Sequence, residues 1–164
     1  KCQLFYNKEA TKNRLESASK QILHIAAHDK HRINSAYLSY IQLEDGYLYA
    51  DDLLQKELDY ELVTLSACET GKTVIKTSEE MIGLIRGVLF AGARSILVSM
   101  WRIDDKMTVQ LMKYFYNSLK SGKSKITSLS TAQRNLIKNN KNLHPAFWGA
   151  FQLIGDPGPL CYPR

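Results

Sequence analysis

Long apolar runs are absent from this chain of 164 residues. No stretch approaches the roughly 18 apolar residues that mark a candidate membrane-spanning helix, so no membrane contact is expected. The first residues, KCQLFYNKEATKNRL, lack the apolar core of a secretory signal and do not begin with methionine. We therefore expect residues 1–164 to form one domain that is the C-terminal part of a longer chain.

Cysteine is also scarce, because the chain has only Cys2, Cys68 and Cys161. A small secreted scaffold held by disulfides would carry more cysteines, in an even number. The pattern therefore predicts a reducing, cytoplasmic location in which Cys68 stays a thiol. Cys2 and Cys161 are interpreted as incidental surface residues. The sequence shows no internal repeat and no low-complexity segment.

The charge balance is basic, with 22 Lys and Arg against 16 Asp and Glu, which gives a net charge of +6. The basic residues are dispersed, and the densest group, KSGKSK at 120–125, lies at an expected helix end and loop, where lysine is common. Charge alone indicates at most electrostatic affinity for phosphate groups. We interpret it as scattered solubility charge and do not expect direct contact with nucleic acid.

Strand-like and helix-like patterns alternate along the chain. This alternation predicts an α/β fold with a mainly parallel sheet and helices on both faces. Strands are predicted at 21–27, 62–67, 95–100 and 147–154, with a hairpin over 37–49. Helices are predicted at 8–20, 52–58, 78–91 and 126–138, with another that begins at Asp104 or Asp105 and ends at Gly122. Gly83 and Gly87 share one helix face and are interpreted as the place where the sheet approaches that helix.

Two of the predicted strands end in a reactive side chain. The apolar run 62–65 leads into the small polar residues around Cys68, and the run 21–27 ends at His28. The carboxyl ends of parallel strands meet at one edge of a sheet, where functional residues gather. A cysteine with a histidine elsewhere in the chain is a candidate nucleophile and general base. The spacing therefore predicts a Cys68–His28 pair at this edge.

Other interpretations of these residues stay open at this point. Cys68 could be a small core residue without reactivity. His24, inside its strand, is interpreted as a core histidine with its hydrogen bonds satisfied. A zinc site of His24, His28, His31 and Cys68 is imaginable, but no metal-spacing motif supports it, and we expect neither a metal nor an organic cofactor.

Several segments together resemble the CHAT domain, which belongs to the caspase and separase group of cysteine peptidases. They are the histidine-ended strand, SACETG at 66–71, GLIRGVLFAGARSILVSMW at 83–101 followed by Asp104 and Asp105, and FWGAFQLIG at 147–155. The resemblance runs from about Ala10 to Gly155, with the motifs in the family's order. It implies a caspase-like three-layer fold, in which Cys68 matches the nucleophile and His28 the catalytic histidine.

The same resemblance implies a cysteine endopeptidase with an oxyanion hole made by the backbone amides of Asp29 and Cys68. The family usually has glycine where this chain has Asp29, and a carboxylate beside a developing oxyanion is unfavourable unless it is turned away. This difference favours the alternative function, a catalytically inactive interaction or scaffold domain of the same fold.

Substrate and partners are also implied by the resemblance. Asp105, with Asp104 beside it, matches an acidic position that receives a basic substrate side chain in separase-like members, although an aspartate here is also a good helix N-cap. Trp101 would be a pocket wall or part of the core. The expected partners are a protein substrate and a gating partner, either an upstream domain such as tetratricopeptide repeats or a separate sensor subunit. The strand at 95–100 is expected beside the cysteine strand.

Overall fold

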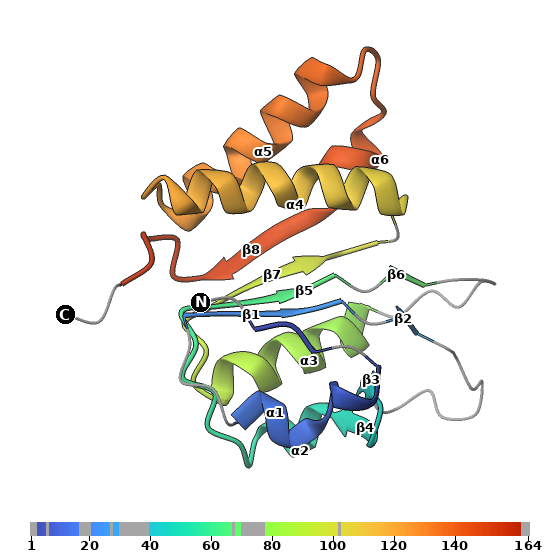
Figure 1. Cartoon of the computed structure of the whole chain (residues 1–164), viewed down its shortest axis with the longest axis vertical. Helices are drawn as coiled ribbons and strands as arrows, with labels where there is room; N and C mark the ends of the chain where they lie inside the picture. The colour runs from blue at the N-terminus through green and yellow to red at the C-terminus, as the bar shows by residue number, and fades with distance from the viewer. Residues whose placement is uncertain are drawn as a thin grey trace.

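The computed structural model describes residues 3–5, 7–16, 21–26, 28–29, 40–66, 68–69, 78–101 and 103–161. In this part of the chain a central sheet lies between two layers of helices (Figure 1). Within the same ranges, no helix is both long enough and apolar enough to cross a membrane.

Four strands form the central sheet in the order β1-β5-β7-β8. They are β1 (Ile22–Ile25), β5 (Leu62–Leu65), β7 (Ser95–Ser99) and β8 (Phe151–Gly155). The first three are parallel, and β8 pairs antiparallel with β7. Every residue of β5 and β7 is buried, as is typical of parallel strands covered on both faces. The α/β fold and the mainly parallel sheet are thus confirmed, and β7 lies beside β5 as expected.

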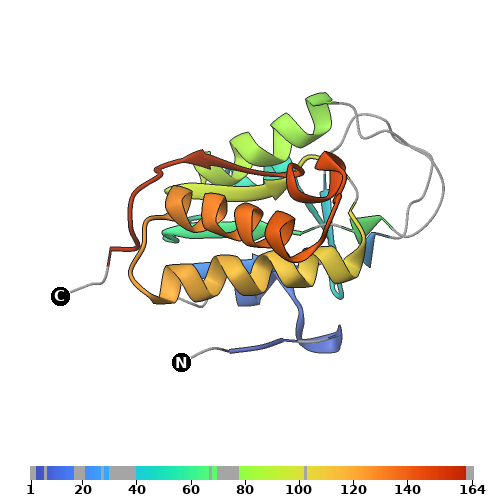
Figure 2. The same cartoon turned by 90° about the horizontal axis from the view of Figure 1, so that it is seen from above.

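One face of the sheet is covered by α1 (Lys12–Glu16), α2 (Ala50–Leu53) and α3 (Ser78–Phe90). The other is covered by α4 (Asp105–Lys120), α5 (Lys125–Asn139) and α6 (Pro145–Trp148), with α4 and α5 side by side (Figure 2). Alternate strand residues enter the two cores. Val63 and Leu65 pack on the α3 side, whereas Leu62 packs with Phe115 of α4. Helices on both faces are confirmed.

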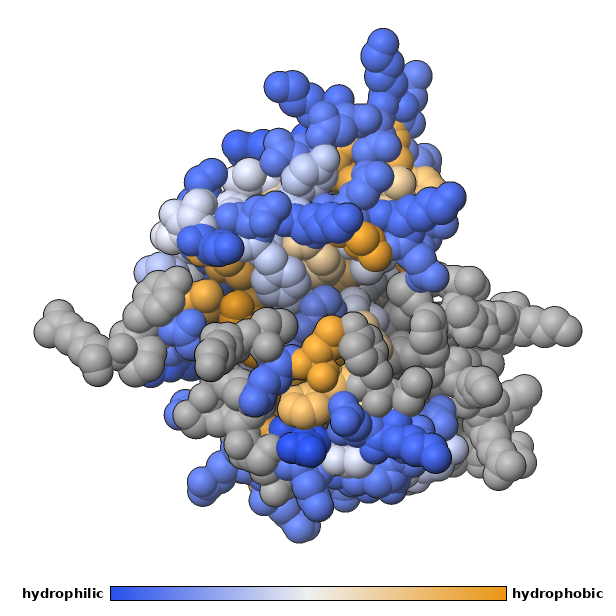
Figure 3. Space-filling view, viewed as in Figure 1, coloured by the Kyte–Doolittle hydropathy of each residue, from blue (hydrophilic) through white to orange (hydrophobic). Residues whose placement is uncertain are grey.

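The space-filling view supports this division into layers. Hydrophilic residues dominate the exposed side of the α4 layer, and apolar residues show in the zone between that layer and the sheet (Figure 3). The structure also has a short helix, η1 (Asn7–Glu9), and a hairpin of β3 (Tyr40–Leu43) and β4 (Gly46–Tyr49). Leu48 of the hairpin is fully buried in the core on the α3 side, so the hairpin is part of that layer.

Two predicted elements were wrong because long-range contacts and one proline outweigh the local pattern. The helix predicted at 52–58 is only the four residues of α2, because the backbone N–H of Leu58 donates instead to the Ala91 carbonyl at 2.6 Å. The strand predicted at 147–154 begins only at Phe151. Pro145 starts a helix instead, since its ring fixes a helical φ at the first position, and the His144 ring accepts from the Ala146 N–H at 3.2 Å.

Two further expectations need correction. The helix predicted at 8–20 is divided into η1 and α1, which ends at Glu16, and residues 17–20 lie outside the described ranges. Gly87 meets α2 and not the sheet, because a Cβ atom there would lie 2.9 Å from the Ala50 carbonyl oxygen and 3.2 Å from Leu53. The small residue therefore lets two helices on the same face of the sheet approach each other.

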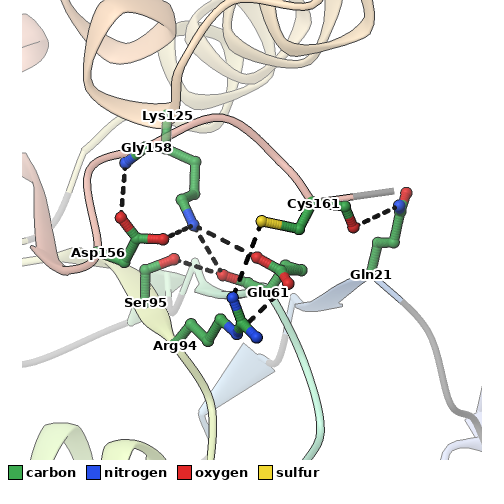
Figure 4. A network of polar contacts seen from close by, with 8 residues as sticks. All are labelled: Gln21, Glu61, Arg94, Ser95, Lys125, Asp156, Gly158 and Cys161. Atoms are coloured by element: carbon green, nitrogen blue, oxygen red, sulfur yellow. Dashed lines mark hydrogen bonds and ion pairs between the residues drawn. The ribbon is translucent and has the colours of Figure 1, made fainter. Parts of the chain in front are cut away.

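A polar network fastens the amino-terminal edge of β5 and β7 to the C-terminal segment (Figure 4). The fully buried Lys125 ammonium donates to the Glu61 carbonyl at 3.3 Å and to the Asp156 carboxylate at 3.2 Å. Arg94 pairs with the Glu61 carboxylate at 3.4 Å, and the Ser95 hydroxyl donates to the Glu61 carbonyl at 2.6 Å. This edge is opposite the carboxyl ends at which reactive residues are predicted.

Candidate active site

The chain forms a second, shorter parallel pair beyond β1 and β5. It consists of β2 (His28–Asp29) and β6 (Cys68–Glu69), in which His28 is the register partner of Cys68. Between the two pairs, the Ser66 N–H donates to the Ile25 carbonyl at 3.1 Å and keeps the two segments of the chain together. The backbones of the two predicted catalytic residues therefore lie on neighbouring strands, about 4.8 Å apart in such a pair, at the carboxyl end of the sheet (Figure 1). Their side chains lie outside what the structure describes.

A cleft of about 650 Å³ lies between this edge and α4. The strands contribute His24, Ala26 and Ser66, which precede the β2–β6 pair by only a few residues. The helix contributes the other described lining residues, Asp105, Thr108, Val109, Met112, Lys113, Tyr116 and Asn117. The cleft therefore combines an apolar wall, one carboxylate, one ammonium group and several hydroxyl groups.

A chain of hydrogen bonds crosses the strand side of this cleft. The Tyr116 hydroxyl donates to the Thr64 hydroxyl at 3.0 Å and lies 3.1 Å from Nδ1 of His24. Nε2 of His24 lies 2.8 Å from Oγ of Ser66. Thr64 is fully buried and Ser66 is 7% exposed, while His24 faces the cleft. His24 is thus hydrogen-bonded as expected, but it is a lining residue of the cleft and not a core residue.

Burial favours the uncharged forms of the two titratable side chains in this hydrogen-bond series, His24 and Tyr116. Desolvation lowers the pKa of His24 below its ordinary value of 6.5, although part of the ring meets solvent in the cleft. Desolvation also raises the pKa of Tyr116 to about 12, despite the opposing hydrogen bond with Thr64. At neutral pH the imidazole and the phenol are therefore both uncharged.

The two adjacent aspartates at the start of α4 have different positions. The Asp104 carboxylate accepts from the backbone N–H groups of Lys106 at 2.9 Å and Met107 at 3.3 Å, so Asp104 is the helix N-cap. Asp105 lines the cleft and is the only acidic residue among its described lining residues. Asp105 can therefore attract a cation that occupies the cleft.

Trp101 is outside the core, because it is 46% exposed, and its indole N–H donates to the Ala146 carbonyl at 2.8 Å. It is not among the described residues that line the cleft. For metals, no group of three or more His, Cys, Asp and Glu that could hold an ion is found among the described residues. The side chains of His28, His31 and Cys68 lie outside that search, so the expected lack of a metal stays a prediction.

Sequence reasoning did not single out Ser66, Lys113 or Tyr116. One signal was present, since Asp105, Val109, Met112 and Tyr116 recur at the three- and four-residue steps of a single helix face. That pattern did not show which strands the face covers. The contact of Tyr116 with His24 joins residues 92 positions apart, and it follows only from the packing of α4 on β1 and β5.

Comparison with known proteins gives two findings. The sequence model of a family described as CHAT domain matches residues 1–156. The curated protein tetratricopeptide repeat protein 28 of Homo sapiens is 31% identical over 121 residues, which cover 74% of this chain and 5% of the human protein. The protein of the same name from Mus musculus matches with the same identity and coverage. The chain thus spans only a small part of the length of these relatives.

Proposed function

The chain belongs to the CHAT domain family, which is caspase-like, and on this premise we propose that it is a cysteine endopeptidase domain acting through Cys68 and His28. The observation that carries the proposal is the register of the short β2–β6 pair, in which these two residues are backbone partners at the carboxyl end of a mainly parallel sheet. Strand ends of this kind are where α/β folds gather functional residues. The few cysteines, odd in number, favour a reducing compartment, and we propose a cytoplasmic location.

The proposed reaction is acyl transfer through a thioester. His28 takes the thiol proton of Cys68, and the sulfur attacks the carbonyl carbon of the scissile peptide bond. The tetrahedral intermediate expels the amine, which receives its proton from His28, and water then hydrolyses the thioester. The backbone N–H groups of Asp29 and Cys68 are the proposed donors to the oxyanion.

We further propose that the substrate residue before the cut is Arg or Lys. Asp105 supports this, since it places one carboxylate in a cleft that is also lined by Ser66, which follows β5 and precedes Cys68 by two residues. The aliphatic stem of a basic side chain can lie against Val109 and Met112 while its charged end reaches the acid. Asp104 is already occupied by capping α4, so it is not needed for recognition.

Peptide-library cleavage by the full-length protein tests this function. Cys68→Ala and His28→Ala are expected to reduce cleavage to background. Asp105→Asn should lower the preference for basic over neutral residues by about 10- to 100-fold, because a charged hydrogen bond contributes about 1.5–3 kcal/mol. Asp59→Asn, an exposed aspartate on the loop before β5, is the matched control and should change nothing. Unchanged selectivity in Asp105→Asn would leave Asp105 without a role in recognition.

A second candidate function is an inactive interaction or scaffold domain, and the presence of Asp29 beside His28 favours it. Because the matched relatives are named for tetratricopeptide repeats, we propose that such repeats, or a separate sensor subunit, gate the domain in either case.

An arginyl acyloxymethyl ketone distinguishes the two functions by alkylating an activated thiol. Alkylation of Cys68 in the full-length protein supports the peptidase, and its absence with and without the upstream partner supports the scaffold.

A further inference from the structure

We propose that Ser66 is a second activated nucleophile, with His24 as its general base, and that the cleft accepts acyl or phosphonyl electrophiles at this serine independently of Cys68. The proposal goes beyond the peptidase function. It would stand if Cys68 proved inactive, because it uses neither Cys68 nor His28.

The proposal starts from the distance between the two side chains. A serine hydroxyl is activated when a base lies within hydrogen-bond reach and a third group orients that base. Oγ of Ser66 and Nε2 of His24 are 2.8 Å apart, and the opposite nitrogen of the ring lies 3.1 Å from the Tyr116 hydroxyl. Nucleophile, base and orienting group are therefore all present among the described residues.

The hydrogen bonds of Tyr116 bear on which nitrogen of the His24 ring can accept a proton from Ser66. The Tyr116 hydroxyl has one hydrogen, and it donates this hydrogen to Thr64. In the arrangement in which Tyr116 donates to Thr64, it accepts from His24 and Nδ1 carries the proton of the neutral imidazole, and we assign this tautomer to His24. Nε2 is left with a lone pair that accepts from the Ser66 hydroxyl. This is the tautomer that a general base for serine requires.

The surroundings keep both helper groups in the required state. Tyr116, whose pKa is about 12, stays a neutral hydroxyl across the working range of pH. His24, whose pKa is lowered by desolvation, is the free base at neutral pH. The charged groups of α4 that line the same cleft as the His24 ring are Asp105 and Lys113, which are eight positions apart on the helix and so about 12 Å apart along its axis.

The location also suits a reaction. Ser66 and His24 both line the cleft, and Ser66 follows the last residue of β5, where the carboxyl end of the strand opens onto that space. Lys113 brings a positive charge to the same cleft, and positive charge favours the anionic state of an attacked carbonyl or phosphonyl group. The apolar wall of Val109 and Met112 fits an acyl chain.

Ester hydrolysis at Ser66 consumes only the ester and one water molecule. As Oγ of Ser66 bonds to the carbonyl carbon of an ester, its proton passes to Nε2 of His24. The alkoxide leaves with the electrons of the broken carbon–oxygen bond and takes that proton. Water then attacks the acyl-serine, with His24 again accepting and returning a proton. With a fluorophosphonate, the same attack on phosphorus expels fluoride, and the phosphonyl-serine remains.

The test uses a fluorophosphonate probe on the full-length protein with Cys68→Ala, so that no label can come from that thiol. Peptide mapping should find the label on Ser66 in the folded protein and none there after denaturation. Ser66→Ala should abolish it. His24→Gln, which can still hydrogen-bond but cannot take the proton, should slow labelling by about 100-fold, a typical general-base contribution. Ser128→Ala, at another buried serine, is the matched control and should label normally.

The pH profile is a second readout that needs no variant of the pair. Labelling should be constant above the ordinary histidine pKa of 6.5 and fall as the pH drops through the lower pKa of His24, because a protonated Nε2 cannot accept. The proposal is overturned if Ser66 stays unlabelled in a protein that melts cooperatively. It is also overturned if His24→Gln labels at an unchanged rate or if labelling does not depend on pH. If His24→Gln fails to fold, Tyr116→Phe takes its place in the test. Slower labelling of Ser66 in Tyr116→Phe than in the protein that retains Tyr116 supports the proposal, and an unchanged rate contradicts it.

Discussion

Lys125→Met tests the network that fastens the amino-terminal edge of the sheet. The Lys125 side chain is fully buried, and its ammonium reaches the Glu61 carbonyl, the Asp156 carboxylate and, at 3.8 Å, the Glu61 carboxylate. Methionine retains most of the buried stem, so the substitution removes the charge and its hydrogen bonds with little loss of packing. The measured change in unfolding free energy therefore reports on the polar contacts.

The loss of unfolding free energy in Lys125→Met depends on which contacts the former partners of the ammonium keep. Removing one member of a buried ion pair costs about 3–5 kcal/mol when the other charge is left buried and unpaired. Here the Glu61 carbonyl keeps its bond from Ser95, and the Glu61 carboxylate keeps Arg94. The Asp156 side chain is 41% exposed and can be hydrated. We therefore expect a loss of about 1–3 kcal/mol, the range for hydrogen bonds to charged groups.

Urea unfolding followed by tryptophan fluorescence measures this loss. Lys123→Met changes an exposed lysine two residues away and should stay within about 0.5 kcal/mol of the original protein. The backbone N–H of Gly158 and, after it, Lys125 lower the pKa of Asp156. The stabilisation that the ionised Asp156 carboxylate gives is therefore present above its unfolded pKa and disappears as the pH falls through its folded pKa. The difference between Lys125→Met and the original protein should shrink in acid. Equal stability of Lys125→Met and Lys123→Met at neutral pH would refute this account of the network.

Four further substitutions have defined outcomes. Gly87→Ala should destabilise by about 1–3 kcal/mol through overpacking against Ala50, although alanine favours the helix by about 1 kcal/mol; a stabilised variant in thermal melts would show that α2 yields. Asp104→Ala should cost about 1 kcal/mol through loss of the cap, whereas Asp105→Ala should leave the melting temperature nearly unchanged. Equal losses for the two would contradict their division of roles. Tyr116→Phe should cost about 1–3 kcal/mol, because both hydrogen-bond partners of its hydroxyl lose a contact; urea midpoints equal to the original protein would show that water replaces it.

Local sequence patterns were sufficient to predict two kinds of element. These are strands buried on both faces and helices whose buried residues recur periodically. The runs that became β5 and β7 are apolar because both faces of these strands are covered, and no register argument was needed to find them. The predicted helix at 126–138 became α5 within one residue at each end, since the serine before it caps the helix, as serine commonly does. The location of His28 and Cys68 shortly after two apolar runs is visible in the sequence, whereas their separate short strands, β2 and β6, are visible only in the structure.

Other features followed from contacts between distant parts of the chain. α2 ends after Leu53 because Leu58 is held by the carbonyl of Ala91, just after α3, a bond that local helix propensity does not reveal. Two adjacent aspartates can each cap a helix, and the sequence left both roles open for Asp104 and Asp105. Successive residues on a helix differ in direction by about 100°. Once α4 packs across β1 and β5, that angle directs one carboxylate to the helix N–H groups and the other into the cleft. The chain from Tyr116 through His24 to Ser66 arises in the same way, because only tertiary packing brings a helix face to strands far away in sequence.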